Sequence, residues 1–296
     1  MKLGFIGLGQ MGKPMALNIL RSGDQLIVYA RKTAAFPEFV ARGARATTDL
    51  AEVAQADIIF LCLPGSQAVQ DVVLGEQGLS SYLTAGQIIV DFSTIKYTTT
   101  IEIAKCLAER SIVFIDAPIT GMEARAVAGT LTVMCGGIEE TVAVVKPYLE
   151  CIGDKVIYMG GSGSGQLTKL MNQLLLNINL AGLAEVLPLA VKMGLDPEKV
   201  GQVVNSGTGR SYASEFFVSR ILAGNFSEGY PLQNAYKDLI SAAEISANLC
   251  IPLPVLHAAT TTYQMALLKG YGEQDKGAMI NVFEDLLGIK YRNHQE

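Results

Sequence analysis

The chain begins MKLGFIGLGQMGKPMALNIL (residues 1–20), in which a short apolar run leads into a glycine-rich loop and then into a second apolar stretch. The run at 2–6 has the composition of a buried strand, and the stretch at 13–20 has that of a helix. The loop at 7–12 reads GLGQMG, and the next apolar run, LIVYA, follows at 26–30. This order predicts a strand–helix–strand unit whose glycine loop and helix N-terminus bind the pyrophosphate of a dinucleotide.

The glycine spacing GxGxxG is a weak signal by itself, because a simple tight turn can produce it. Its place directly after a strand and before a helix favours cofactor binding over the turn. The loop residues that we take as candidates for phosphate binding are Gly7, Gly9, Gln10, Met11 and Gly12.

The end of the run at 26–30 indicates which nicotinamide cofactor is bound. An acidic residue there would accept hydrogen bonds from the ribose 2′-hydroxyl of NAD, but Ala30 stands in this position. The following Arg31, Lys32 and Thr33 can neutralise and hydrogen-bond a 2′-phosphate. We expect NADP to be preferred and NAD to be possible; the alternative is that both cations are only solvated surface charges.

Short apolar runs alternate with helical patterns through the first half of the chain. This alternation is typical of a largely parallel sheet with helices on both faces. The runs expected to form strands are KLGFI (2–6), LIVYA (26–30), DIIFLCL (57–63), QIIVDFS (87–93), IVFIDA (112–117), LTVMCGG (131–137) and KVIYMGG (155–161).

After the glycine- and serine-rich segment at 160–165, the pattern is helical to the end of the chain. The expected fold is an α/β Rossmann-like N-terminal domain with a mostly parallel, doubly wound sheet. A long interdomain helix joins it to an all-α C-terminal domain. We place the two domains at 1–162 and 163–296.

The composition excludes several classes of function. The 296-residue chain is 50% hydrophobic and 17% charged, with a net charge of −5 and no basic run, which argues against nucleic-acid binding. Five scattered cysteines and two histidines offer neither a disulfide framework nor a metal site. No export signal is visible, so a cytoplasmic location is expected. Polar residues within the apolar segment 170–194 favour a buried helix over a membrane span.

Two polar loops, 61–67 and 91–95, follow predicted strands further along the chain. Ligands of open α/β sheets lie at the carboxyl ends of the strands, so both loops are expected to border the cofactor. Serine and threonine at such positions also cap helices, which is the alternative. The candidates in these loops are Leu63, Pro64, Ser93 and Thr94.

Five segments carry a resemblance to a known family. They are FIGLGQMGKPMALNI (5–19), DFST (91–94), DAPITGMEARAVAGTL (116–131), GSGQLTKLMNQ (163–173) and KDL (237–239). In this order and spacing the chain resembles the β-hydroxyacid dehydrogenases, which include 3-hydroxyisobutyrate dehydrogenase, tartronate semialdehyde reductase and, more distantly, 6-phosphogluconate dehydrogenase. The resemblance implies an NAD(P)-dependent oxidoreductase that acts on a small carboxylate and forms a homodimer or homotetramer.

By this resemblance Lys169 matches the catalytic lysine of the family and Asn172 matches the amide beside it. The chemistry supports the match, because hydride transfer to a carbonyl leaves an alkoxide that needs a proton donor, and a lysine ammonium supplies one. Apolar surroundings are expected to lower the pKa of Lys169 towards neutrality. The alternative is a lysine that extends over apolar surface at the rim of a buried helix.

The resemblance also assigns Thr120 and Gly121 to the loop that binds the substrate carboxylate, and Lys237 and Asp238 to a cofactor-side motif of the second domain. Most members of the family carry serine at the position of Thr120 and glycine at that of Met122. The substrate pocket beside Met122 is therefore expected to be tighter and more apolar than usual.

Within the family, the pair Asn172 and Gln173 and the opening MKLGFIGLG are similar to the tartronate semialdehyde reductases. With the NADP-type strand end, these features favour reduction of a short semialdehyde acid to a hydroxy acid. One alternative is an NAD-dependent 3-hydroxyisobutyrate or related dehydrogenase, and another is a catalytically silent dinucleotide-binding module. Imine reductases share the architecture but generally lack the lysine at position 169.

Overall fold

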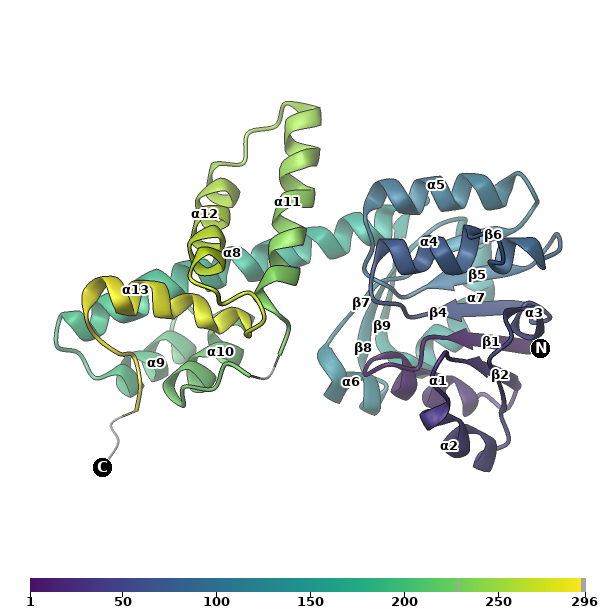
Figure 1. Ribbon diagram of the computed structural model, residues 1–296, viewed down its shortest axis with the longest axis horizontal. Coiled ribbons are helices and arrows are strands. Elements are labelled where there is room, and N and C mark those ends of the chain that lie inside the picture. The colour runs from purple at the N-terminus through teal and green to yellow at the C-terminus, as the bar shows by residue number, and fades with distance from the viewer. Residues whose placement is uncertain (228, 294–296) are drawn as a thin grey trace. The chain divides into compact units, whose positions relative to one another are not determined.

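The structure is a computed structural model that describes residues 1–227 and 229–293 (Figure 1). By internal contacts the chain forms two compact units, Met1–Lys169 and Leu170–Glu296. The first unit is an α/β domain around one sheet, and every named element of the second unit is a helix. The fold class predicted from the sequence is therefore confirmed.

The sheet of the first unit, all of whose residues are described, has nine strands. Their order is β3-β2-β1-β4-β5-β6-β8-β7, and β9 pairs with β8. Strands β1 to β6 are parallel, whereas β8 runs antiparallel to β6 and β7. The strands are β1 (Lys2–Ile6), β2 (Gln25–Tyr29), β3 (Arg45–Thr47), β4 (Ile58–Leu61), β5 (Ile88–Asp91), β6 (Val113–Asp116), β7 (Ile119–Thr120), β8 (Leu131–Gly136) and β9 (Gly153–Gly160).

The strand order reverses between β1 and β4, which is the point of a doubly wound sheet where ligands bind. Each of the seven predicted runs overlaps one of the strands, although β2 begins one residue and β9 two residues before its run. β3 and β7 have no signal in the sequence, because three and two residues are too few to show a periodic pattern.

Helices cover both faces of the sheet (Figure 1). Those of the first unit are α1 (Gly12–Leu20), α2 (Phe36–Ala41), α3 (Leu50–Val53), α4 (Ser66–Leu74), α5 (Tyr97–Ala108), α6 (Met122–Ala128) and α7 (Glu139–Ile152). Alternate residues of the central strands enter different cores. In β4, Phe60 packs with α1 and α7, whereas Ile59 packs with α4 and α5. Strands buried on both faces read as continuous apolar runs, as seen in the sequence.

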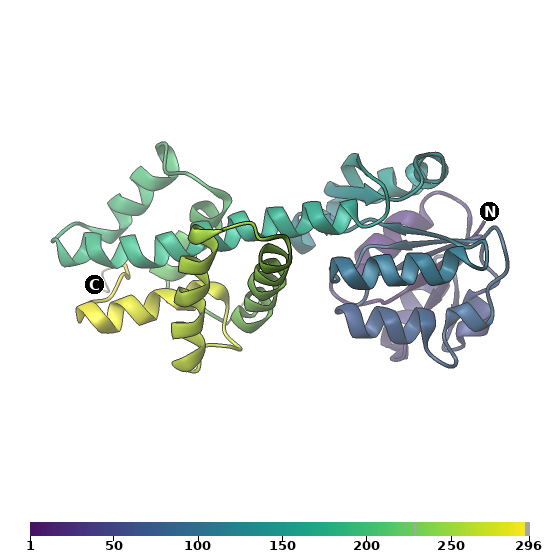
Figure 2. The ribbon, with the colours of Figure 1, turned by 90° about the horizontal axis from the view of Figure 1, so that it is seen from above.

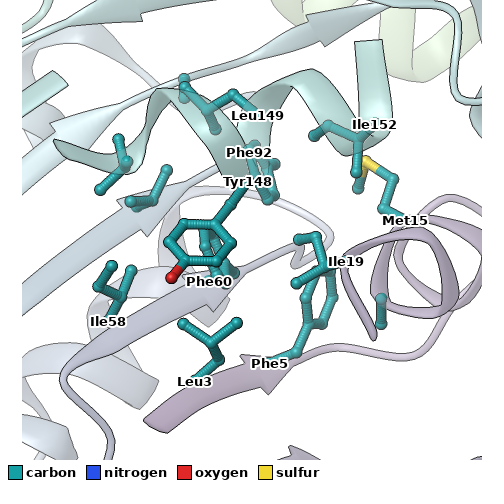
Figure 3. Close-up of a cluster of buried hydrophobic side chains, with 14 of the residues drawn as sticks. Leu3, Phe5, Met15, Ile19, Ile58, Phe60, Phe92, Tyr148, Leu149 and Ile152 are labelled. Atoms are coloured by element: carbon teal, nitrogen blue, oxygen red, sulfur yellow. The ribbon is translucent and has the colours of Figure 1, made fainter. Parts of the chain in front are cut away.

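The core on the α1 and α7 side contains a group of aromatic rings (Figure 3). Phe60 and Phe92 stack with their ring centroids 5.6 Å apart, and Phe5 lies 6.3 Å from each of them. Such pairs add to the free energy that burial of the rings contributes. The packing fixes β1, β4 and β5 against one another and thus fixes the loops at their carboxyl ends.

The long helix α8 (Ser164–Lys192) continues from the first unit into the second as one helix (Figure 2). The second unit adds α9 (Pro197–Ser206), α10 (Tyr212–Leu222), α11 (Leu232–Leu249), α12 (Pro254–Leu268) and α13 (Ile280–Leu287). Leu180 and Leu187 of α8 pack there with Phe217, Leu239 and Tyr263 from other helices. These contacts make α8 the central helix of the helical core.

Among the described residues, α8 is the one helix that is long and apolar enough to cross a membrane, with a mean hydropathy of 1.8. Length and composition alone do not distinguish such a span from the core helix of a soluble protein. Leu180 and Leu187 of this helix are buried, whereas Leu175 and Leu189 are exposed.

Candidate active site

The three glycines of the loop after β1 differ in their surroundings. A Cβ on Gly7 would lie 2.2 Å from the carbonyl oxygen of Cys62, and one on Gly12 would lie 1.8 Å from that of Gly7. Gly7 also has a φ of +102°, which residues with a side chain rarely adopt. A Cβ on Gly9 would meet nothing within 4 Å. The fold thus requires glycine at positions 7 and 12, whereas the open space at Gly9 fits the approach of a pyrophosphate to the backbone.

Helix α1 starts at Gly12, directly after Met11, and no side chain among residues 1–227 and 229–293 caps its N-terminus. An uncapped helix start has unsatisfied N–H groups and the positive end of the helix dipole, which together favour a phosphate. The Gln10 Nε2 donates a hydrogen bond to Glu123 Oε2 at 2.6 Å. This bond ties the glycine loop to the first turn of α6.

The cations predicted to bind a 2′-phosphate lie beside this loop. The Gly7 N–H donates to the carbonyl oxygen of Tyr29 at 3.3 Å, so the loop contacts the end of β2. Arg31 and Lys32 follow and are exposed, and neither forms a hydrogen bond or ion pair with any described residue. Thr33 begins the 3₁₀ helix η1 (Thr33–Ala35).

The loops 61–67 and 91–95 are joined by a side-chain hydrogen bond. The Ser93 Oγ accepts from the Leu63 N–H at 2.8 Å, rather than capping α5. Pro64 and Thr94 are exposed next to these two residues. The structure therefore brings together four of the candidate segments, those that follow β1, β2, β4 and β5, at one edge of the parallel sheet.

The candidate substrate loop follows β7. Gly121 has a φ of +141° and Met122 has a φ of +63°. For Met122, which is 41% exposed, this left-handed conformation is strained, whereas glycine would adopt it freely. The Asn18 Nδ2 donates to the carbonyl oxygen of Ala126 at 2.8 Å, which holds α6 against α1. Thr120, at the end of β7, is partly buried.

Lys169 lies in α8 and is 8% exposed. Asn172, one turn further along the same helix, is exposed. In the second unit, Lys237 is exposed on α11, with its Nζ 3.4 Å from Asn234 Oδ1. The neighbouring Asp238 accepts from Gln173 Nε2 at 3.5 Å, a contact that links α11 to α8 within that unit.

Sequence reasoning missed three polar residues behind the strand ends. Asp116 accepts backbone N–H bonds from Gly163 at 2.7 Å and Gln166 at 2.9 Å, and thereby caps α8. Asp91 accepts from the Ser93 N–H at 2.9 Å. The Gln166 Nε2 donates to the Ser93 carbonyl oxygen at 2.7 Å. The signal available in the sequence was an acidic residue that directly ends a buried run, as in IIVD and VFID.

Burial raises the pKa of Asp91 to about 7, an effect that the hydrogen bonds from Ser93 oppose and the nearby Asp116 strengthens. Burial also raises the pKa of Asp116, against the opposing effect of the backbone N–H groups of Gly163 and Gln166. Two buried carboxyl groups therefore lie behind the loops that the sequence assigns to the cofactor.

A glycine loop of this geometry, at the reversal point of a parallel sheet, defines a dinucleotide-binding domain. The family described as "NAD binding domain of 6-phosphogluconate dehydrogenase" matches residues 2–160. The family described as "NAD-binding of NADP-dependent 3-hydroxyisobutyrate dehydrogenase" matches residues 163–283. The two families together match both units of the chain.

Similar proteins agree with these matches. The chain is 39% identical over 296 residues to 2-(hydroxymethyl)glutarate dehydrogenase of Eubacterium barkeri, covering 99% of this chain and 98% of that protein. It is 35% identical over 281 residues to mitochondrial 3-hydroxyisobutyrate dehydrogenase of Mus musculus, covering 92% of this chain and 84% of that protein. The solved structure "Psf3 in complex with NADP+ and 2-OPP" matches with a TM-score of 0.81 and 30% identity, and the match covers 96% of this chain and 99% of that one.

The protein is an NAD(P)-dependent hydroxyacid dehydrogenase. It belongs to the 3-hydroxyisobutyrate dehydrogenase family of β-hydroxyacid dehydrogenases. The finer resemblance to tartronate semialdehyde reductases needs correction, because a relative that matches almost the whole chain is named for 2-(hydroxymethyl)glutarate. That resemblance rested on the pair Asn172 and Gln173 and on the opening MKLGFIGLG, and these segments are too short to distinguish substrates.

Proposed function

We propose that the protein catalyses reversible hydride transfer between NADP(H) and a short hydroxy acid, with Lys169 as the general acid and base. The observation that carries this proposal is the position of Lys169 within the first unit. Gln166, one turn earlier on α8, bonds through its side chain to Ser93 O and the Ile95 N–H. These bonds fix the first turns of α8 to the strand ends at which the cofactor candidates gather.

The preference for NADP rests on the end of β2. Ala30 supplies no carboxylate for a ribose 2′-hydroxyl, and Arg31 and Lys32 supply two exposed cations beside the glycine loop. The relative solved with NADP+ supports this preference. The open space at Gly9 and the uncapped start of α1 would hold the pyrophosphate.

When bound, the nicotinamide supplies or accepts the hydride. In the reductive direction, the Lys169 ammonium donates a proton to the substrate oxygen as the carbonyl carbon is reduced, and in the oxidative direction its amine accepts that proton. The amide of Asn172, one turn along the helix, can hydrogen-bond the same oxygen. A lysine suits both directions best when its pKa is near neutrality, which stays a prediction for Lys169.

The names of the relatives favour one substrate class. Both 3-hydroxyisobutyrate and 2-(hydroxymethyl)glutarate are 3-hydroxypropanoates that differ in the group at carbon 2. Glycerate, the product of tartronate semialdehyde reduction, belongs to the same class. We propose that Thr120 and the Gly121 N–H bind the shared carboxylate, and that Met122 contacts the variable group.

The decisive experiment measures oxidation of NADPH and NADH by the purified protein with aldehydes of this class. The panel is tartronate semialdehyde, methylmalonate semialdehyde and 2-formylglutarate, with succinic semialdehyde as the control whose aldehyde is one carbon further from the carboxylate. We expect turnover of at least one of the first three, faster with NADPH, and slower turnover of the control. Cofactor binding without turnover of any aldehyde would favour the silent binding module instead.

We also propose that the protein forms a homodimer or homotetramer in the cytoplasm. Leu175, Val186, Leu189 and Met193 of α8 and the turn after it are exposed at helical spacing and form an apolar stripe. Light scattering on the eluting protein would measure the number of subunits, and a monomer at micromolar concentration would contradict the assembly.

A further inference from the structure

Two buried carboxyl groups lie side by side in the sheet of the first unit. Asp91 and Asp116 are paired positions at the ends of the parallel strands β5 and β6, and both are 0% exposed. Neither forms an ion pair with a cation in the described part of the chain. Two negative charges in such surroundings repel each other without screening by water, so one of the pair is expected to keep its proton.

Asp91 and Asp116 have different hydrogen-bond partners, and this difference decides which of the two carboxyl groups keeps the proton. Asp116 accepts backbone N–H bonds at the N-terminus of α8, where the helix dipole also favours a negative charge. Asp91 accepts from the Ser93 N–H with Oδ1, but its Oδ2 has no hydrogen-bond partner among the described residues. Asp116 therefore carries the charge and Asp91 carries the proton, in agreement with the pKa of about 7 for Asp91.

Ser93 connects Asp91 to the loops on the cofactor side. Its backbone N–H and its hydroxyl both interact with the Asp91 carboxyl group, and the hydroxyl accepts the Leu63 N–H at 2.8 Å. Its carbonyl accepts from Gln166 Nε2 at 2.7 Å. A change at Asp91 is thus transmitted to loop 61–67, to loop 91–95 and to the turn of α8 that precedes Lys169.

We propose that Asp91 is a positioning residue that, in its protonated form, holds the cofactor loops 61–67 and 91–95 in place through Ser93. This inference rests on the proposed function, because it assumes that these loops contact the nicotinamide cofactor. An ionised Asp91 beside Asp116 requires water, and water reaches it when loop 91–95 moves outwards. That movement displaces Ser93, frees the Leu63 N–H and weakens cofactor binding as the pH rises.

Two thiols near the pair keep one charge state in this pH range. Burial raises the pKa of Cys62, in the segment after β4, to about 12, and it raises that of Cys135 in β8 to about 12 as well. Both thiols remain neutral. A phosphate monoester such as the 2′-phosphate of NADPH has its second pKa near ~6, so its charge is nearly constant above about pH 7. Lys169, one turn beyond Gln166 on α8, is proposed to exchange a proton in the same range. A change in affinity between about pH 7 and about pH 8.5 is therefore assigned to the aspartate pair when the variant Lys169→Ala retains it.

The test is the dissociation constant of NADPH, measured by its fluorescence without substrate, from about pH 6.5 to about pH 8.5. If NADPH binds only when Asp91 is protonated, a pKa of about 7 makes the dissociation constant rise about 25-fold over this range. If the ionised form also binds NADPH, but more weakly, we expect a rise of about threefold or more. We expect Asp91→Asn to abolish this rise. Glu76→Gln, a change at an exposed carboxylate just after α4 in the same unit, is the control and should follow the wild type.

A constant affinity in the wild type, or a rise that Asp91→Asn retains, would overturn the inference. If Asp91→Asn does not fold, Ser93→Ala replaces it, since this variant keeps the carboxyl group but loses the hydroxyl link. We expect Ser93→Ala to bind NADPH weakly at all pH values, with the rise much reduced. Absence of NADPH and NADH binding at about pH 6.5 would refute both this inference and the proposed function, whereas binding without turnover would refute only the function.

Discussion

Gly12 packs so closely against Gly7 that a Cβ at position 12 would lie 1.8 Å from the Gly7 carbonyl oxygen. Gly9, between them, has nothing within 4 Å of its Cβ position. The same motif therefore contains glycines that the fold requires and a glycine that only a ligand would require.

This difference predicts opposite effects of two alanine substitutions. Gly12→Ala should lower the free energy of unfolding by more than about 3 kcal/mol, because the backbone oxygen of Gly7 must move. Gly9→Ala should change it by less than about 0.5 kcal/mol, yet weaken NADPH binding about tenfold or more. Thermal unfolding and NADPH titration measure the two effects. The control is Gly209→Ala in the second unit, where a Cβ also meets nothing within 4 Å; tight NADPH binding by Gly9→Ala would contradict the phosphate site.

The choice of cofactor should depend on Arg31 and Lys32, which are exposed beside the glycine loop. The double change Arg31→Ala and Lys32→Ala should weaken NADPH binding by about tenfold to a hundredfold, because each cation is proposed to form a charge-assisted contact with the 2′-phosphate. NADH lacks that phosphate and should bind as before. Equal losses for the two cofactors would show that the cations do not contact the 2′-phosphate.

The role of Lys169 can be separated from cofactor binding. Lys169→Ala should reduce kcat by about a hundredfold to ten-thousandfold, because it removes the proton donor, and leave the dissociation constant of NADPH nearly unchanged. Lys192→Ala on the same helix is the control, since among the described residues that exposed lysine donates only to the Leu287 carbonyl oxygen, at 2.9 Å. Single-turnover kinetics with an accepted aldehyde compare the rate of reduction by the wild type and the two variants. Full activity of Lys169→Ala would exclude Lys169 as the general acid.

The glycine loop and the cofactor loops could be predicted from the sequence because their signals are local. A strand, three glycines and a helix stand within the first twenty residues, and loops 61–67 and 91–95 directly follow apolar runs. The pairing of Asp91 with Asp116 depends on the register of β5 and β6, which no single segment encodes. The link from Gln166 to Ser93 joins residues far apart in the chain, so it required the folded structure.

The prediction for Met122 combines one observation from the sequence with one from the structure. The sequence identified it as a departure from the usual glycine of the family, and the structure gives it a left-handed φ of +63°. Met122→Gly should therefore be more stable than Met122→Ala by about 1 kcal/mol, since only glycine relieves the strain. At Val127 of the same helix, which has an ordinary φ, alanine should be the more stable by about the same amount. Urea unfolding of the four variants tests this reversal, and an advantage for alanine at both positions would rule out strain at Met122.

The pH dependence of stability should report the charge state of Asp91 independently of any ligand. Its pKa rises from 3.8 to about 7 on folding, so the folded state binds the proton more tightly than the unfolded chain does. The stabilisation is complete below about pH 4 and is lost as the pH rises through about 7. Between about pH 5 and about pH 8 the wild type should lose about 2.5 kcal/mol relative to Asp91→Asn, which cannot ionise. Urea unfolding of both proteins across this range measures the difference, with Glu76→Gln expected to track the wild type. A difference that stays constant with pH would mean that Asp91 is already charged at pH 5, so that burial does not hold a proton on it in the folded state.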